Sequence, residues 1–303
     1  MRRWKPQPSI GRWVALALLG LTLALAAVVL VQLAGALAGP PEEWRVDIEL
    51  FGRVVALLAL LAIAGWLAYR AAAAFTLSYE LDRNGLYIIW LGNRAVVPLD
   101  RITSIDVGAS ARLPWRLTQG IGYYWGQARL EDGQVMHLFA TQPPARCLIV
   151  YTTDGAYAVS PADHEAFVQD LEQRRNLGAA KPLAPTVEPS RIFLYEFWND
   201  RTVRWLLLVA LAMNLAALGF LALRYPSLAP LIEMRFDATG EVAELRPRHQ
   251  ALFLPLAAFV LSLLNIALGL ALYHRERLGA RLLQGASVIV QMLFAVALAT
   301  VLL

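Results

Sequence analysis

Residues 75–99 read FTLSYELDRNGLYIIWLGNRAVVPL, and this stretch decides the fold. Short runs rich in β-branched and aromatic residues alternate with RNG at 83–85 and GN at 92–93, which are typical of tight turns between antiparallel strands. The preceding residues 54–69, VVALLALLAIAGWLAY, contain no polar interruption. The sequence therefore changes near Phe75 from a membrane-helix pattern to a strand pattern.

The composition indicates a membrane protein. Apolar residues make up 58% of the 303-residue chain and charged residues 17%, with a mean hydropathy of +0.51, whereas globular chains have roughly 45–50% apolar and about 25% charged residues. A membrane span needs about 20 apolar residues. Five stretches meet that length, at residues 14–38, 51–75, 205–223, 251–273 and 282–303. The first two are separated by a Gly-Pro-Pro turn and are expected to form a hairpin.

Basic residues near the span ends predict the orientation. Four basic residues and no acidic residue precede the first span: Arg2, Arg3, Lys5 and Arg12. We therefore expect the N-terminus inside, residues 70–204 inside, the loop 224–250 outside and the C-terminus outside. A signal peptide cleaved after Ala38 is the alternative for the first span, but a signal core has only about 7–15 apolar residues.

The strand pattern resumes at residues 127–160 and ends in a helix. Four connections in the whole β-rich region are two or three residues long, which favours an antiparallel meander. Ser160 is the predicted N-cap of the helix and Pro161 its first residue, because these residue types are preferred at those positions.

Two motifs carry a resemblance to a known family. Residues 79–105, YELDRNGLYIIWLGNRAVVPLDRITSI, and residues 150–171, VYTTDGAYAVSPADHEAFVQDL, resemble the bacterial pleckstrin-homology (PH) domains found in multi-span membrane proteins. The resemblance implies a nearly closed, mainly-β barrel capped by one C-terminal helix. It also implies a multi-pass protein of the bacterial cytoplasmic (inner) membrane.

The expected fold is thus a membrane α-helical protein of five transmembrane helices with an inserted PH-like barrel. The predicted parts are an N-terminal tail and two-helix hairpin at 1–75, a cytoplasmic PH-like domain at 76–177, a Pro-rich linker and juxtamembrane segment at 178–203, and three transmembrane helices at 204–303. The external loop is similar to a small transmembrane domain of unknown function through Phe236, Asp237, Gly240 and Glu241, although Arg235 stands where that family often has histidine.

No residue pattern predicts catalysis. The spans have no Asp or Glu at their centres, and the sequence has no HExxH, GxSxG or Walker A motif, so we predict no enzyme, cofactor or nucleic-acid partner. His137, His164 and the single Cys147 have no partners at metal-ligand spacing, so we also predict no metal site. The polar residues of the spans are expected to join helices rather than line a transport path: Asn214, Ser262, Asn265, Gln284, Ser287 and Gln291.

Charge and aromatic content predict how the insert binds partners. Residues 70–204 contain 14 basic and 14 acidic residues, which argues against phosphoinositide binding. Aromatic and arginine residues gather between Gly108 and Gln127, and such residues are preferred at interfaces. The candidate contact residues are Arg112, Trp115, Arg116, Tyr123, Tyr124 and Trp125. The alternative is that Trp115 and Tyr123 cap the barrel.

The leading functional hypothesis is a non-enzymatic membrane protein that presents the PH-like domain for protein interaction or scaffolding. The expected partners are the lipid bilayer and a protein not identified by the sequence, and a homo-oligomer is left open. The alternative is a transport- or channel-associated subunit that the PH-like domain regulates.

Overall fold

The computed structural model describes residues 2–109, 111–112, 122–130, 133–178, 183, 186–188, 197–198, 200–236 and 242–302. Close contacts divide the chain into two units. Unit 1 comprises Met1–Leu23 and Ala62–Phe193, and unit 2 comprises Ala24–Leu61 and Leu194–Leu303.

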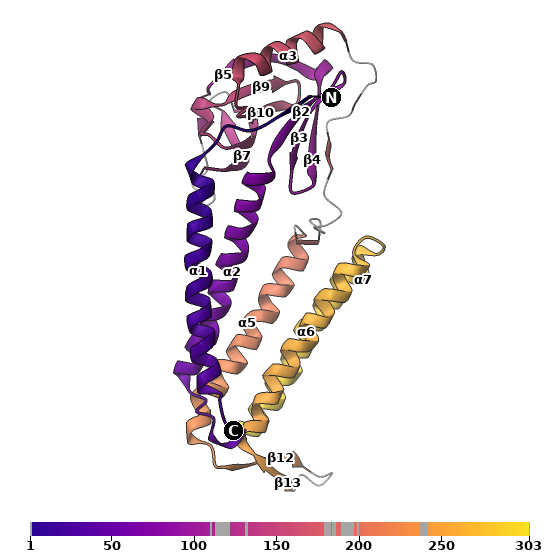
Figure 1. The fold of residues 1–303 in the computed structure, drawn as a ribbon. Helices are drawn as coiled ribbons and strands as arrows, with labels where there is room; N and C mark the ends of the chain where they lie inside the picture. The colour runs from indigo at the N-terminus through magenta and orange to yellow at the C-terminus, as the bar shows by residue number, and fades with distance from the viewer. Residues whose placement is uncertain are drawn as a thin grey trace. The chain divides into compact units, whose positions relative to one another are not determined.

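Five helices of the described chain are long and apolar enough to cross a membrane, by length and composition. They are α1 (Ile10–Ala36), α2 (Ile48–Thr76), α5 (Arg201–Arg224), α6 (Phe253–Leu272) and α7 (Arg277–Leu302) (Figure 1). The five predicted helices are confirmed. Four of them begin before the predicted spans, because helical hydrogen bonding extends outward from the apolar run into polar and charged residues such as those at 201–204, whereas α6 begins two residues later than predicted.

The first sheet of unit 1 has five strands in the order β1-β2-β3-β4-β11. The strands are β1 (Arg2–Trp4), β2 (Ser78–Leu81), β3 (Gly85–Trp90), β4 (Asn93–Pro98) and β11 (Thr186–Glu188). Every neighbouring pair is antiparallel. Leu91 and Gly92 turn from β3 to β4 with positive φ angles of 47° and 77°, the conformation that two-residue hairpins prefer.

The second sheet of unit 1 has six strands in the order β5-β9-β10-β8-β7-β6. They are β5 (Ile102–Val107), β6 (Ala111–Arg112), β7 (Tyr124–Leu130), β8 (Val135–Ala140), β9 (Leu148–Thr152) and β10 (Gly155–Val159). All four predicted hairpins form, as β2–β3, β3–β4, β7–β8 and β9–β10. A simple meander is nevertheless wrong, because β10 lies parallel to β8. The connection at 141–147 is long enough to place β9 one strand away from β8. The β9–β10 hairpin then inserts β10 between β9 and β8.

The basic N-terminal segment, expected to be a tail, instead forms strand β1. Arg3 pairs with Glu80 and Trp4 with Tyr79. The Trp4 side chain is buried, its ring meets that of Phe167 edge-on at 5.6 Å, and its indole N–H donates to Asp170 at 3.3 Å. The expectation of a tail rested on charge and overlooked this apolar anchor.

The helix of the domain, α3 (His164–Asn176), begins later than predicted. Its N-cap is Asp163, whose Oδ1 accepts a hydrogen bond from Ala166 N at 3.0 Å, so the assignment of Ser160 as cap is wrong. Residues 160–162 lie outside the helix, because their backbone pairs with the segment after β1: Gln7 N donates to Ser160 O and Ala162 N to Lys5 O.

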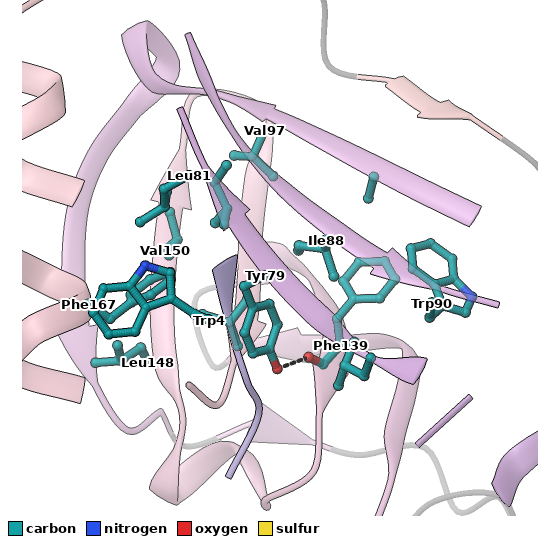
Figure 2. Packing of buried hydrophobic residues seen from close by; sticks show 14 of the residues in the cluster. Trp4, Tyr79, Leu81, Ile88, Trp90, Val97, Phe139, Leu148, Val150 and Phe167 are labelled. Carbon is teal, nitrogen blue, oxygen red and sulfur yellow. Dashed lines mark hydrogen bonds between the residues drawn. The ribbon is translucent and has the colours of Figure 1, made fainter. Parts of the chain in front are cut away.

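The core of unit 1 lies between the two sheets and α3 (Figure 2). Its labelled members come from both sheets, the helix and the N-terminal strand: Trp4, Tyr79, Leu81, Ile88, Trp90, Val97, Phe139, Leu148, Val150 and Phe167. Full burial of one such side chain contributes about 1.5–3 kcal/mol. The described strands form two sheets around this core, and a continuous, nearly closed barrel remains an expectation.

Unit 2 contains a three-helix arrangement in which α7 packs against both α5 and α6. The segment expected to be an external loop contains a hairpin of β12 (Leu231–Phe236) and β13 (Val242–Pro247) (Figure 1). Unit 2 has an apolar cluster of its own, which includes Leu50, Leu221, Tyr225 and Leu298.

Candidate functional site

The predicted contact loop is described only in part. Trp115 and Arg116 lie outside the described residues, and Arg112 is described only as backbone in β6. Tyr123 is 3% exposed and belongs to the core cluster, and Trp125 packs against that cluster. Tyr124, partly exposed, packs against the neighbouring apolar cluster in the second sheet. The described aromatic residues of this segment therefore pack within the domain.

Tyr123 lies beside the end of helix α2 in unit 1. Arg70, which is 5% exposed, donates through Nη2 to Tyr123 O at 3.3 Å and lies 4.9 Å from the ring centre of Trp66. The rings of Trp13 and Phe75 also meet, edge-on at 5.7 Å. Within unit 1, the Arg70 bond thus joins α2 to the domain, and the ring pair joins α1 to α2.

The turn between β2 and β3 is internally bonded. Asp82 Oδ1 accepts hydrogen bonds from Asn84 N at 2.7 Å and Gly85 N at 2.8 Å. Arg83, the single arginine of this turn, donates to the carbonyls of Leu177 and Gly178. Its guanidinium is therefore engaged by the end of α3.

Strand β1 adds positive charge to the domain that the count over residues 70–204 omits. Arg3 donates to Ser78 Oγ at 3.2 Å and lies 3.9 Å from a Glu80 carboxylate oxygen. The Arg2 guanidinium lies 4.2 Å from the ring centre of Trp4. Tryptophan within a basic segment is the sequence signal that could have indicated this strand.

Strand β5 is an edge of the second sheet among the described residues. Thr103, Ser104 and Asp106 are exposed, and Val107 is 73% exposed. Gly108 N donates to Cys147 O at 2.8 Å, and inward and outward N–H groups alternate along an antiparallel strand. The N–H of Val107 therefore points away from β9, toward the open edge.

The polar residues of the long helices bond to one another and to helix carbonyls. Asn214 Nδ2 donates to Pro255 O at 2.8 Å and Gln291 Oε1 at 3.0 Å. Gln291 Nε2 donates to Ala258 O and to Ser262 Oγ. In a second layer, Asn265 Nδ2 donates to Ser287 Oγ and Gln284 Nε2 to Asn265 O. These bonds link α5, α6 and α7, as interhelical hydrogen bonds do in membranes.

The single cysteine and His137 pack within the domain. Cys147 is fully buried, which raises its thiol pKa to about 12, and its Sγ donates to Gln142 O. His137 stacks on Tyr157 at 5.2 Å, and burial lowers its pKa. Among the described residues, no three His, Cys, Asp or Glu side chains are grouped for metal binding.

The external motif is not assembled in the described structure. Asp237, Gly240 and Glu241 lie outside the described residues, and Phe236 is described only as the backbone end of β12. Its resemblance to the small transmembrane domain stays an expectation.

Comparison with known families identifies the β-rich part of unit 1. Residues 77–175 match the family model of the bacterial PH domain. No curated protein and no solved structure matches the chain. The matched range begins after α2 and ends within α3, and so includes β2 to β10 and most of the helix. Residues 77–175 are therefore a bacterial PH domain, in a chain that also has five helices long and apolar enough to cross a membrane.

Proposed function

We propose that this chain is a non-enzymatic protein of the bacterial cytoplasmic membrane, whose PH domain binds another protein. Its five long helices span the bilayer, with the N-terminus and PH domain inside and the C-terminus outside. The asymmetry of basic residues around the first span supports this orientation.

The exposed edge of β5 carries the proposal for protein binding. An open strand edge presents backbone donors and acceptors that can pair with an extended segment of a partner protein. Val107 combines an outward N–H with a side chain that is 73% exposed. The partner segment adds as a further strand beside β5, and exposed side chains of β5 set its specificity.

Two observations weigh against the rival functions. The Arg83 guanidinium is bonded to backbone carbonyls and is not directed to a lipid headgroup. The polar side chains of α5, α6 and α7 bond among themselves, which favours helix association over a transport path.

Substitution at Val107 tests the proposal. Val107→Pro removes the outward N–H and leaves the bonds to β9 in place, whereas Val107→Ala retains that N–H. Full-length protein in mild detergent should capture its partner as wild type and as Val107→Ala, and lose capture at least about tenfold as Val107→Pro. Equal capture by both variants would contradict strand addition. Thermal unfolding of each variant controls for folding.

Lipid binding is measured in parallel, because β1 adds cations to the domain. Full-length protein is titrated with anionic vesicles at low and high salt. We expect no change between the wild type and Val107→Pro in this assay. A vesicle-binding loss in Val107→Pro equal to its loss of protein capture would assign the edge to the membrane instead.

A further inference from the structure

Two neighbouring cavities lie at one end of unit 2. The first, of about 330 Å³, is formed by helices α2, α5 and α6 and the turn before α2. The second, of about 360 Å³, lies where the loop before α2 meets the end of α5 and the start of α6. Trp44 and Val46 line both cavities, so the two adjoin, and together they offer a site with two chemically different halves.

The first cavity is apolar along its length. On α2 it is lined by Leu50, Val54 and Leu58, which recur every four residues and so lie on one helix face. Leu218 of α5 and Phe259 of α6 are among the residues that line the opposite walls. Eight residues of helix separate Leu50 from Leu58, a rise of about 12 Å. Asn214 is the one polar residue of this lining.

The second cavity is lined by charges of both signs. Three are carboxylates, Glu42, Glu43 and Asp47, and two are guanidinium groups, Arg45 and Arg248. Within the described residues, no ion pair joins any of these carboxylates to either arginine. Arg248 is held in place by Tyr225, whose ring centre lies 5.0 Å from the guanidinium carbon.

We propose that this site binds one membrane phospholipid with a zwitterionic amine headgroup, of the phosphatidylethanolamine type. An acyl chain lies in the apolar cavity between α2, α5 and α6. The headgroup phosphate accepts hydrogen bonds from Arg248 and Arg45, and the ammonium donates to Glu42, Glu43 and Asp47. The charged residues flank the helix ends, at the level where a headgroup meets the hydrocarbon of a bilayer.

Charge complementarity distinguishes this occupant from other lipids. An anionic lipid would satisfy the two arginines and leave three carboxylates facing a negative group. A phosphocholine lipid carries both charges, but its quaternary ammonium has no N–H with which to donate. A primary ammonium has three donors, as lysine does. The inference depends on the helices spanning a membrane and not on the proposed role of the PH domain.

Lipid selectivity of the full-length protein tests the proposal. Protein in mild detergent is incubated with equal amounts of phosphatidylethanolamine, phosphatidylglycerol and phosphatidylcholine of identical acyl chains, and bound lipid is measured by native mass spectrometry. We expect one phosphatidylethanolamine per chain, enriched about tenfold over the other two. Arg248→Gln should lower the amount of phosphatidylethanolamine bound, because it deletes a charged donor to the phosphate. Leu218→Trp should lower occupancy by filling the apolar cavity.

Matched variants separate this site from general contact with the bilayer. Arg246→Gln, on β13, and Leu264→Trp, on an exposed face of α6, change the same residue types outside the two cavities. Both should retain the wild-type selectivity. Equal binding of all three lipids by the wild type, or equal loss in Arg248→Gln and Arg246→Gln, would overturn the proposal.

A further variant keeps the test decisive if Arg248→Gln fails to fold. Glu42→Gln with Glu43→Gln removes two carboxylates from the polar cavity and leaves both arginines. We expect it to lower phosphatidylethanolamine binding and to leave phosphatidylglycerol binding equal or higher. Unchanged selectivity in this double variant would exclude recognition of the ammonium group.

Discussion

Removing one hydroxyl group at the centre of unit 1 should measurably destabilise the PH domain. Tyr79 is fully buried, and its hydroxyl donates to Phe139 O at 2.7 Å (Figure 2). The same oxygen accepts a hydrogen bond from Ser160 N at 3.0 Å. Tyr79→Phe keeps the ring and deletes both bonds, which leaves a buried carbonyl and a buried N–H to find other partners.

The structure sets the size of the effect. A hydrogen bond contributes about 0.5–1.5 kcal/mol net, so two bonds give about 1–3 kcal/mol. We expect a loss near 2 kcal/mol, which raises the opening equilibrium roughly 30-fold. Tyr87→Phe is the matched control on the next strand. Its hydroxyl donates to Asp82 Oδ2 at 3.0 Å in a part-buried bond, and its loss should cost less than about 1 kcal/mol because water can replace it.

Amide hydrogen exchange of the full-length chain in detergent measures this difference. Peptides from β2, β8 and β10 should exchange faster in Tyr79→Phe, because opening of the core exposes these strands together. Peptides from α5 to α7 serve as an internal reference. Equal effects of Tyr79→Phe and Tyr87→Phe, or a change below about 0.5 kcal/mol in Tyr79→Phe, would refute the importance of this buried network.

Two further predictions concern the N-terminal strand and the base of α5. Trp4→Ala should cost about 3–5 kcal/mol, because it removes a buried ring that packs on Phe167. Limited proteolysis should then cleave the N-terminal segment, and unchanged resistance would contradict its place in the core. The side chain of Asp200 is largely buried. Burial alone would raise the pKa of its carboxyl group, but hydrogen bonds from Arg281, Tyr273 and backbone N–H groups outweigh burial, so the pKa is lowered. Its stabilising contribution is therefore present at neutral pH and lost as the pH falls below about 4. Thermal unfolding should show this acid loss in the wild type and a smaller one in Asp200→Asn, and identical pH profiles would exclude the effect.

Local signals made the hairpins predictable, and non-local pairing made the sheet order unpredictable. The turn predicted at Gly92-Asn93 forms one residue earlier, at Leu91-Gly92, where Gly92 supplies one of the two positive φ angles, at 77°. The parallel pairing of β8 with β10 depends instead on where a seven-residue connection at 141–147 carries the chain. Ser160 has good cap chemistry, but pairing of residues 160–162 with the N-terminal segment overrides that local preference.

The candidate sites show the same division. The role of the polar residues in the spans, joining helices, could be predicted because the donors and acceptors of each side chain are known from its residue type. The exposed edge of β5 could not be predicted, since it depends on which strand ends the sheet. The paired cavities could not be predicted either, because Leu50, Leu218 and Phe259 come from helices far apart in sequence.

The N-terminal strand explains how the PH domain is attached to the long helices. Strand β1 is followed by α1 after residues 5–9, and α2 is followed by β2 after Leu77 alone. These two strands are neighbours, and their cross-strand partners include Trp4 and Tyr79. The two residues that anchor the core in Figure 2 therefore also fix the points where both helices enter the domain. Because both connections are short, a change in the packing of this pair acts on residues next to the ends of both helices.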